Sequence, residues 1–239
     1  MSSARRTTAY VLSLLLVLLF TGCAIDGNTE SAVRLPSHGV TIEEGPGFTQ
    51  AIIRNPLAIA ARYVEQNGCT IRYPIVCNAD MELLNLSIRT VFSDFAAENG
   101  VKGGTVDFSI EFNNYGLVSF LMTSFDRDGG AFFVDAASFN SDNGRRVRLS
   151  DCFGSIETDY TSRLRDIVTR YIEANKLTLV SEIPPINDDS LFLFTYDGLF
   201  LVYREYELAT YDAGMPRIRV KLSNVMDLLA HDGLLNRVS

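Results

Sequence analysis

The chain has 239 residues, of which 47% are apolar and 21% charged, the balance of a globular protein with room for one large domain or two small ones. Its formal net charge of −8 argues against nucleic acid as a partner, because a phosphate backbone is bound by an excess of Lys and Arg. No apolar run reaches the roughly 20 residues that a membrane-spanning helix needs.

The N-terminus is typical of a secretory leader. Arg5 and Arg6 form a short positive region, and Tyr10–Phe20 is an apolar run interrupted only by Ser13. That run suits the core of a signal peptide and is too short for a membrane span. The alternative, a buried helix of the folded domain, is disfavoured by the paired arginines and by the small residues that follow. We therefore predict a signal peptide over residues 1–22.

The leader ends at Phe20-Thr21-Gly22-Cys23, which resembles the lipobox of bacterial lipoproteins, although leucine is usual where Phe20 stands. Small residues let extended backbone enter the signal peptidase, and the Cys23 thiol is the nucleophile that takes the lipid. Two acyl chains, at about 0.8 kcal/mol per buried methylene, hold a protein at a membrane. We expect lipidation at Cys23 and a place in the cell envelope, in the outer membrane if the bacterium has one, because Ala24 follows.

A polar tether is predicted over residues 23–50, since this segment has no helical or strand period. Loss of residues 1–22 removes Arg5 and Arg6, so Lys+Arg falls from 21 to 19 against 29 Asp+Glu, and the mature net charge is −10. Such a surface would attract a strongly basic protein. An acidic, solvated surface without a partner is the open alternative.

Two strands and a helix are predicted first in the folded part. The strands flank Asn67-Gly68, a pair that favours a tight hairpin because both turn residues need positive φ. The helix has Asn78 or Asp80 as its N-cap and ends near Gly100, and its apolar residues recur at helical spacing. These elements are residues 58–66, 69–76 and 79–98, with Leu84, Ile88, Val91 and Phe95 on the core-facing stripe.

Three further strands are separated by turns rich in Asn, Asp and Gly. In the first of them the apolar residues from Val106 to Phe112 alternate with Asp107, Ser109 and Glu111, which predicts one buried face and one wet face. The predicted strands are 105–112, 117–125 and 131–139.

The remaining elements complete an α+β fold. A second helix is predicted over 157–176, followed by strands that flank Asp197-Gly198 as a second tight hairpin. A last strand leads into Ser223, the expected N-cap of a short C-terminal helix. The order predicts a largely antiparallel sheet with two main helices packed on it. The last strands are 191–195, 199–203 and 217–222, and the predicted units are an N-terminal ββα subdomain, 51–104, and a C-terminal domain, 105–230.

Besides Cys23 the chain has Cys69, Cys77 and Cys152. Cys69 and Cys77 would lie about 26 Å apart in an extended segment, too far for a disulfide. A Cys77–Cys152 disulfide and three buried thiols remain as alternatives, of which we favour the second.

The sequence predicts no catalytic centre, no metal site and no cofactor. The two histidines, His38 in the tether and His231 near the C-terminal end, do not suit a Ser-His-Asp arrangement, and no cysteines and histidines have zinc-ligand spacing. The segment 126–130 begins like a calcium loop, but glycine and alanine occupy later ligand positions, which favours a turn. Asp107 and Glu111 would lie about 13 Å apart along their strand, too far for a glycosidase pair.

The segment from Tyr203 to Gly214 combines tyrosines with acidic residues. Tyrosine is favoured where one end of a ring is buried and the other meets a partner. The segment is interpreted as a packed corner in which Gly214 supplies positive φ, or alternatively as a binding surface formed by Tyr206, Glu207 and Tyr211.

The segment 196–225 carries Asp197-Gly198-Leu199, then Tyr206-Glu207, and then Ala209, Tyr211 and Gly214. In this pattern it resembles the C-terminal domain of the RsiV family, and with two earlier segments the similarity covers about residues 57–225. The resemblance implies an extracytoplasmic recognition domain, since the family includes a membrane anti-sigma factor whose outer domain binds lysozyme. Thr210 stands where the family commonly has proline. We expect no cytoplasmic sigma-binding segment here, because the leader occupies the N-terminus. The matching residues are Asp197, Gly198, Leu199, Tyr206, Glu207, Ala209, Tyr211 and Gly214, then Phe139, Asn140, Asp142, Gly144, Leu149, Ser150, Asp151 and Phe153, and then Tyr73, Pro74, Asn85 and Ile88.

Three functions are therefore open. The favoured one is a lipid-anchored binding module for an envelope ligand, such as lysozyme or a cell-wall component. A structural or assembly lipoprotein with a constant protein partner is the second. A cell-wall hydrolase that uses carboxylates alone is the third, and it requires two acidic residues converging in a cleft.

Overall fold

A computed structural model describes residues 56–154, 159–210 and 213–238. All of them belong to one compact unit, Gly45–Ser239. The predicted signal peptide, Cys23 and the tether lie outside the described residues. None of the described helices combines the length and the hydropathy that a bilayer crossing requires.

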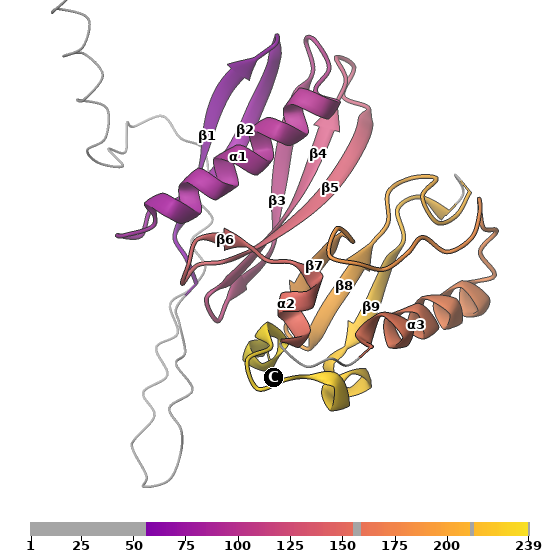
Figure 1. Cartoon of the computed structure of the whole chain (residues 1–239). Coiled ribbons are helices and arrows are strands. Elements are labelled where there is room, and N and C mark those ends of the chain that lie inside the picture. The colour runs from indigo at the N-terminus through magenta and orange to yellow at the C-terminus, as the bar shows by residue number, and fades with distance from the viewer. Residues whose placement is uncertain (1–55, 155–158, 211–212, 239) are drawn as a thin grey trace, which may run out of the picture. The chain divides into compact units, whose positions relative to one another are not determined.

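A six-stranded sheet forms the first layer, and only its second and third strands run parallel. A parallel pair needs a crossover, which α1 (Glu82–Asn99) provides by lying across one face of the sheet (Figure 1). The predicted hairpin is confirmed, with positive φ at Asn67 and Gly68. In spatial order the strands are β1 (Ile59–Gln66), β2 (Cys69–Val76), β3 (Thr105–Asn114), β4 (Leu117–Phe125), β5 (Ala131–Asn140) and β6 (Arg145–Arg146).

The start of α1 differs from the prediction. Met81 takes the N-cap position without a side-chain hydrogen bond, so the prediction of Asn78 or Asp80 as the cap is wrong. Asn78 instead accepts a hydrogen bond from the backbone N–H just before β1. One turn into the helix, the Asn85 amide bonds both the N–H and the C=O of Val76, which ties the helix to the end of β2.

The buried face of α1 and the sheet share one core. Rings of Phe92, Phe108 and Phe120 pack edge to face with centroids 5.8–6.2 Å apart, the arrangement that aromatic quadrupoles favour. This core contains strands from both predicted units, 51–104 and 105–230, because β2 of the first unit pairs with β3 of the second. Its buried residues on α1 and β2–β5 are Cys69, Ile71, Val76, Leu84, Ile88, Phe92, Phe95, Ala96, Val106, Val118, Phe120, Met122, Ala137 and Phe139.

A separate three-stranded antiparallel sheet follows, and α3 (Tyr160–Asn175) packs on it. A short helix, α2 (Leu149–Phe153), precedes α3. The prediction of a C-terminal helix capped by Ser223 is wrong, because Ser223 lies inside the first of three short 3₁₀ turns. The α+β class with a largely antiparallel arrangement is confirmed. The remaining elements are β7 (Phe192–Thr195), β8 (Gly198–Val202), β9 (Arg217–Lys221), η2 (Leu222–Asn224), η3 (Met226–Leu228) and η4 (Leu234–Val238).

A bulge in β3 breaks the predicted alternation. Ile110 pairs with Phe120, but Phe112 pairs with Ser119, so Glu111 is an extra residue. A one-residue shift moves every following side chain to the other face. Phe112 therefore leaves the α1 side and packs against Phe194 and Tyr196, and Ile110 is 45% exposed.

Two buried serine hydroxyls join the sheets. Ser119 of β4 and Ser138 of β5 are cross-strand partners with their Oγ atoms 2.7 Å apart. The Phe194 N–H donates to Ser119 Oγ at 3.0 Å, and Ser138 Oγ donates to the Phe192 carbonyl at 3.2 Å. β7 is an edge strand, and the serines supply hydrogen-bond partners to the edge that faces away from β8.

Ser119→Ala is expected to destabilise the protein by about 1–3 kcal/mol, because the buried Phe194 N–H loses its partner. Urea unfolding followed by circular dichroism measures the change. Ser109→Ala, at an exposed position of β3, is the control and should stay within about 0.5 kcal/mol. A loss at Ser119 no larger than that of the control would contradict the role given to this hydroxyl.

The first turn of α3 predicts an acid-sensitive contribution to stability. The Asp159 carboxylate caps the helix by accepting the Ser162 hydroxyl and N–H and the Thr161 hydroxyl, which lowers its pKa from 3.8 to about 2. Because the pKa of Asp159 is lower in the folded state than in the unfolded state, the ionised carboxylate stabilises the folded protein at pH values above the unfolded pKa. This stabilisation is lost as the pH falls through the folded pKa. Asp159→Asn should flatten the fall in unfolding midpoint between about pH 4 and pH 2. A slope that is unchanged in Asp159→Asn would contradict the assignment.

Candidate functional site

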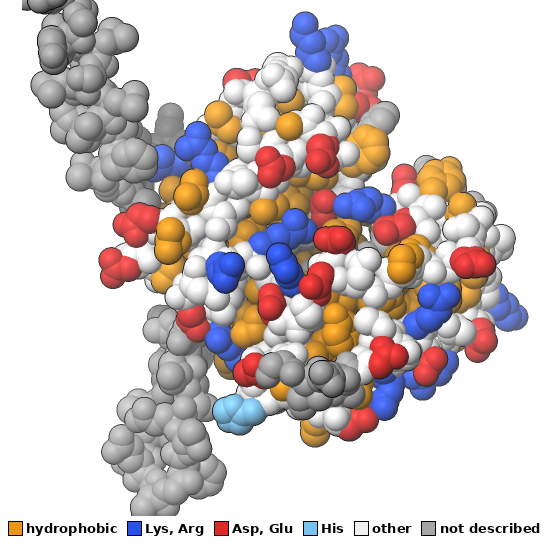
Figure 2. Space-filling view, in the orientation of Figure 1, with side chains coloured by type: hydrophobic (Ala, Val, Ile, Leu, Met, Phe, Trp, Pro, Cys, Tyr) orange, Lys and Arg blue, Asp and Glu red, His pale blue; other side chains and the backbone are white. Residues whose placement is uncertain are grey.

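A polar groove of about 1280 Å³ lies where β5, β6 and α2 meet the segment after residue 187. Basic and acidic side chains are interspersed over this part of the molecule (Figure 2). Four arginines and five aspartates contribute to the lining. These are Arg145, Arg146, Arg148 and Arg204 with Asp135, Asp151, Asp188, Asp189 and Asp232, beside Ser87, Asn140, Asn143, Val147, Ser150, Gly154, Leu191 and Leu234.

The turn between β5 and β6 sets the position of the groove arginines. Gly144 has φ +67°, and a Cβ there would lie 2.7 Å from the Leu84 N, so the turn contacts the first residues of α1. The other side of the turn is tied to η4, where Arg237 pairs with Asp142 at 2.9 Å. Arg145 and Arg146 of β6 therefore project from a segment fixed at both sides.

Most groove aspartates already serve a structural role. Asp151 accepts the Arg148 N–H at 2.8 Å, and Asp188 accepts the Ser150 N–H at 3.0 Å, so both satisfy amides at the start of α2. Asp135 pairs with Arg204 at 2.9 Å. These carboxylates are held in place by partners of the protein itself.

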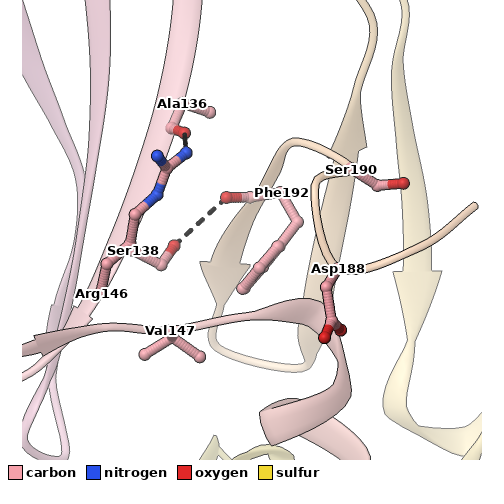
Figure 3. A pocket seen from close by; sticks show the side chains of 7 residues that line it. All are labelled: Ala136, Ser138, Arg146, Val147, Asp188, Ser190 and Phe192. Atoms are coloured by element: carbon pink, nitrogen blue, oxygen red, sulfur yellow. Dashed lines mark hydrogen bonds between the residues drawn. The ribbon is translucent and has the colours of Figure 1, made fainter. Parts of the chain in front are cut away.

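A small cavity of about 20 Å³ adjoins the groove, with which it shares Arg146, Val147 and Asp188. Figure 3 shows the Arg146 side chain running along β5, where its Nη2 donates to the Ala136 carbonyl at 3.3 Å. The Ser138 hydroxyl points to the Phe192 carbonyl on the other side (Figure 3). The volume and the polar wall suit a single water molecule at the inner end of the groove.

The wall behind α2 is densely packed. The rings of Phe153 and Tyr160 stack with centroids 4.4 Å apart and an interplanar angle of 6°. Burial raises the pKa of the Tyr160 hydroxyl, and the negative charge of Asp188 adds to this effect. Burial also raises the pKa of the Cys152 thiol well above its ordinary value, so this thiol is protonated at neutral pH.

No disulfide joins any two of the described cysteines, Cys69, Cys77 and Cys152. A Cys77–Cys152 disulfide is therefore not formed. Cys69 and Cys152 are buried as expected, but Cys77 is exposed after the end of β2, so the prediction of three buried thiols is wrong for that residue.

The predicted binding residues lie at a corner that borders the groove. Tyr206 is 56% exposed with φ +60°, and Glu207 Oε2 accepts the Arg204 N–H at 2.7 Å, which closes the turn. The following residues pair with the segment after α3, through a bridge between Leu179 and Ala209. Tyr211 lies outside the described residues. The backbone forms a packed corner, and Arg204 links it to Asp135 in the groove.

Other candidates from the sequence lie elsewhere. Asp107 pairs with Arg72, and Glu111 pairs with Arg217 at 3.0 Å. Asp126 accepts the N–H groups of two residues within its own turn. Across residues 56–154, 159–210 and 213–238, no three His, Cys, Asp or Glu side chains are grouped as metal ligands would be.

The groove was not predicted as a site. Its residues come from five separate stretches of the chain, so no spacing in the sequence connects them. The one local signal is the run Arg145-Arg146-Val147-Arg148, three arginines within four residues of an acidic chain. Val147 is buried, so this run is anchored in the core between its exposed charges.

Comparison with known proteins gives a match to one family model over a part of the chain that begins after β6. Residues 153–223 match the model of DUF3298, which is described as a protein of unknown function. The matched range lies within residues 57–225, where the sequence predicted a family resemblance. No curated protein matches the chain.

Two solved structures share the fold. One is a DUF3298 family protein from Pseudomonas aeruginosa PAO1, with 13% identity, a TM-score of 0.54, and coverage of 74% of this chain and 96% of that one. The other is a DUF3298 family member from Bacteroides fragilis NCTC 9343, with 14% identity, a TM-score of 0.54, and coverage of 77% and 97%. At these identities the likeness concerns the fold alone.

Proposed function

We propose that this chain is a lipid-anchored binding module that stands outside the cytoplasmic membrane and recognises an envelope ligand, either a basic protein such as lysozyme or a component of the cell wall. The leader and the lipobox before Cys23 support the location. The similarity of residues 196–225 to the RsiV family supports recognition as the task.

The polar groove beside β6 and α2 carries the proposal. It offers positively charged guanidinium groups and negatively charged carboxylates. Two of the carboxylates, Asp151 and Asp188, are held by backbone hydrogen bonds before any ligand binds. Charge-assisted hydrogen bonds from fixed groups hold polar ligands with little further ordering cost. The groove thus has the properties of a recognition surface for a polar ligand.

The acidic surface adds a reason for a basic partner. The mature net charge of −10 gives a long-range attraction to lysozyme-like cations, which mainly raises the association rate and makes binding sensitive to salt. The exposed Tyr206 ring at the corner next to the groove offers an apolar contact for such a partner.

The test is a titration of the full chain, purified in a non-ionic detergent, with lysozyme and with isolated cell-wall material. We expect binding at micromolar concentration to at least one of them, and lysozyme binding should weaken by about tenfold when ionic strength rises from about 20 to 200 mM. Tyr206→Ala should weaken lysozyme binding, whereas Tyr63→Ala, at a comparably exposed ring on β1, should not. No binding of either material at micromolar concentration would remove the proposal.

A further inference from the structure

Three groove arginines have no carboxylate partner in the described part of the chain. Six other arginines form ion pairs within 4 Å of Asp or Glu, whereas Arg145, Arg146 and Arg148 form none with the described carboxylates. All three are exposed and line the same groove. In a chain with 29 acidic residues, this clustering leaves several guanidinium donors available in one place.

We infer that the groove binds an anionic group of its ligand, a carboxylate or a phosphate, through Arg145 and Arg148, with Arg146 beside them. This inference rests on the proposed function and names the chemistry that its site recognises. A guanidinium presents a planar fork of N–H donors that matches the two oxygens of a carboxylate or phosphate, which a point charge does not.

Three of the neighbouring aspartates already have partners within the protein. Asp151 and Asp188 use oxygens to accept backbone N–H groups of α2, and Asp135 pairs with Arg204. The lining carries four arginines against five aspartates, a formal charge of −1, so the groove does not act through a broad positive field. Recognition is of short range and depends on the geometry of the guanidinium groups.

The position of the arginines favours an extended polymer over a small ion. The groove is about 1280 Å³ and open, and the arginines project from β6 and from the residue before α2. A polymer with repeated anionic groups can meet two guanidinium groups at once, and linked contacts raise the apparent affinity without new chemistry. A polyphosphate chain and a polyglutamate chain are the probes that separate the two possible anion sources.

The experiment titrates the full chain in non-ionic detergent with fluorescent polyphosphate and polyglutamate at fixed ionic strength. The double variant R145Q/R148Q should lose about tenfold or more in affinity for the preferred probe, as removal of charge-assisted bonds predicts. R145K/R148K should show most of that loss, because lysine keeps the charge but lacks the fork. R62Q/R89Q, which removes the same charge from two exposed sites outside the groove, should bind as the unchanged protein does.

The outcomes decide between specific and diffuse binding. A loss confined to the groove variants supports the inference, and the probe that binds identifies phosphate or carboxylate as the recognised group. Equal losses in R62Q/R89Q, or no binding of either probe at millimolar concentration, overturn it. Binding of cell-wall material that survives in R145Q/R148Q would also overturn it while leaving the proposed function intact.

Discussion

Replacement of Cys23 by alanine is expected to abolish incorporation of fatty acid into the protein and to leave residues 1–22 attached. The thiol is the nucleophile that accepts the lipid, and no other residue of the predicted lipobox supplies one. A chain of about twelve buried methylenes contributes roughly 10 kcal/mol at about 0.8 kcal/mol each, so two chains give firm attachment and none gives release. Labelling with a fatty acid and mass spectrometry of the intact protein measure both effects.

Cys77→Ala is the matched control for this result. Cys77 is an exposed thiol in the folded part, so its loss should leave labelling complete. Unchanged protein that carries no acyl group and keeps its leader would contradict both the lipid anchor and the proposed location.

Replacement of Gly198 by alanine is expected to cost about 4 kcal/mol, through backbone strain and a steric clash together. Gly198 has φ +146°, and a Cβ there would lie 2.0 Å from the Val220 carbonyl oxygen on β9. Backbone strain of about 1–3 kcal/mol adds to overpacking of about 1–3 kcal/mol. Because domains are stable by only about 5–15 kcal/mol, the variant should unfold at a much lower urea concentration.

Gly129→Ala separates the cost of backbone strain from the cost of overpacking. Gly129 also has a positive φ, +82°, but nothing lies within 4 Å of the added Cβ. Its substitution should cost only the conformational part, about 1 kcal/mol. Equal losses at the two glycines would show that the approach of β9 to Gly198 contributes nothing.

Gly198 also shows which features of the β7–β8 hairpin follow from local sequence and which follow from tertiary contacts. Asp197-Gly198 predicted a hairpin between two strands, and the hairpin exists. However, Thr195 pairs with Gly198, so the turn residues are Tyr196 and Asp197, and the glycine belongs to β8. The requirement for glycine comes from the close approach of β9, a tertiary contact that turn propensities do not describe.

The bulge at Glu111 limits what alternation could predict. A regular strand would place the apolar residues of β3 on one face, whereas the extra residue moves Phe112 to the opposite face and against Phe194. That shift gives Phe112 to the core of the second sheet, and Glu111 reaches Arg217 on β9. The preference for the bulge lies in contacts with residues more than 80 positions later.

The sequence by itself determined the elements whose causes are local. Positive-φ turn pairs, helical spacing of apolar residues and short polar turns predicted both long helices, the Asn67-Gly68 hairpin and a largely antiparallel α+β fold, because each depends on neighbours within a few residues. Only the tertiary structure decided that the strands divide into two sheets joined through Ser119 and Ser138. It alone also formed the groove, since residues from five stretches of the chain meet there only when the chain has folded.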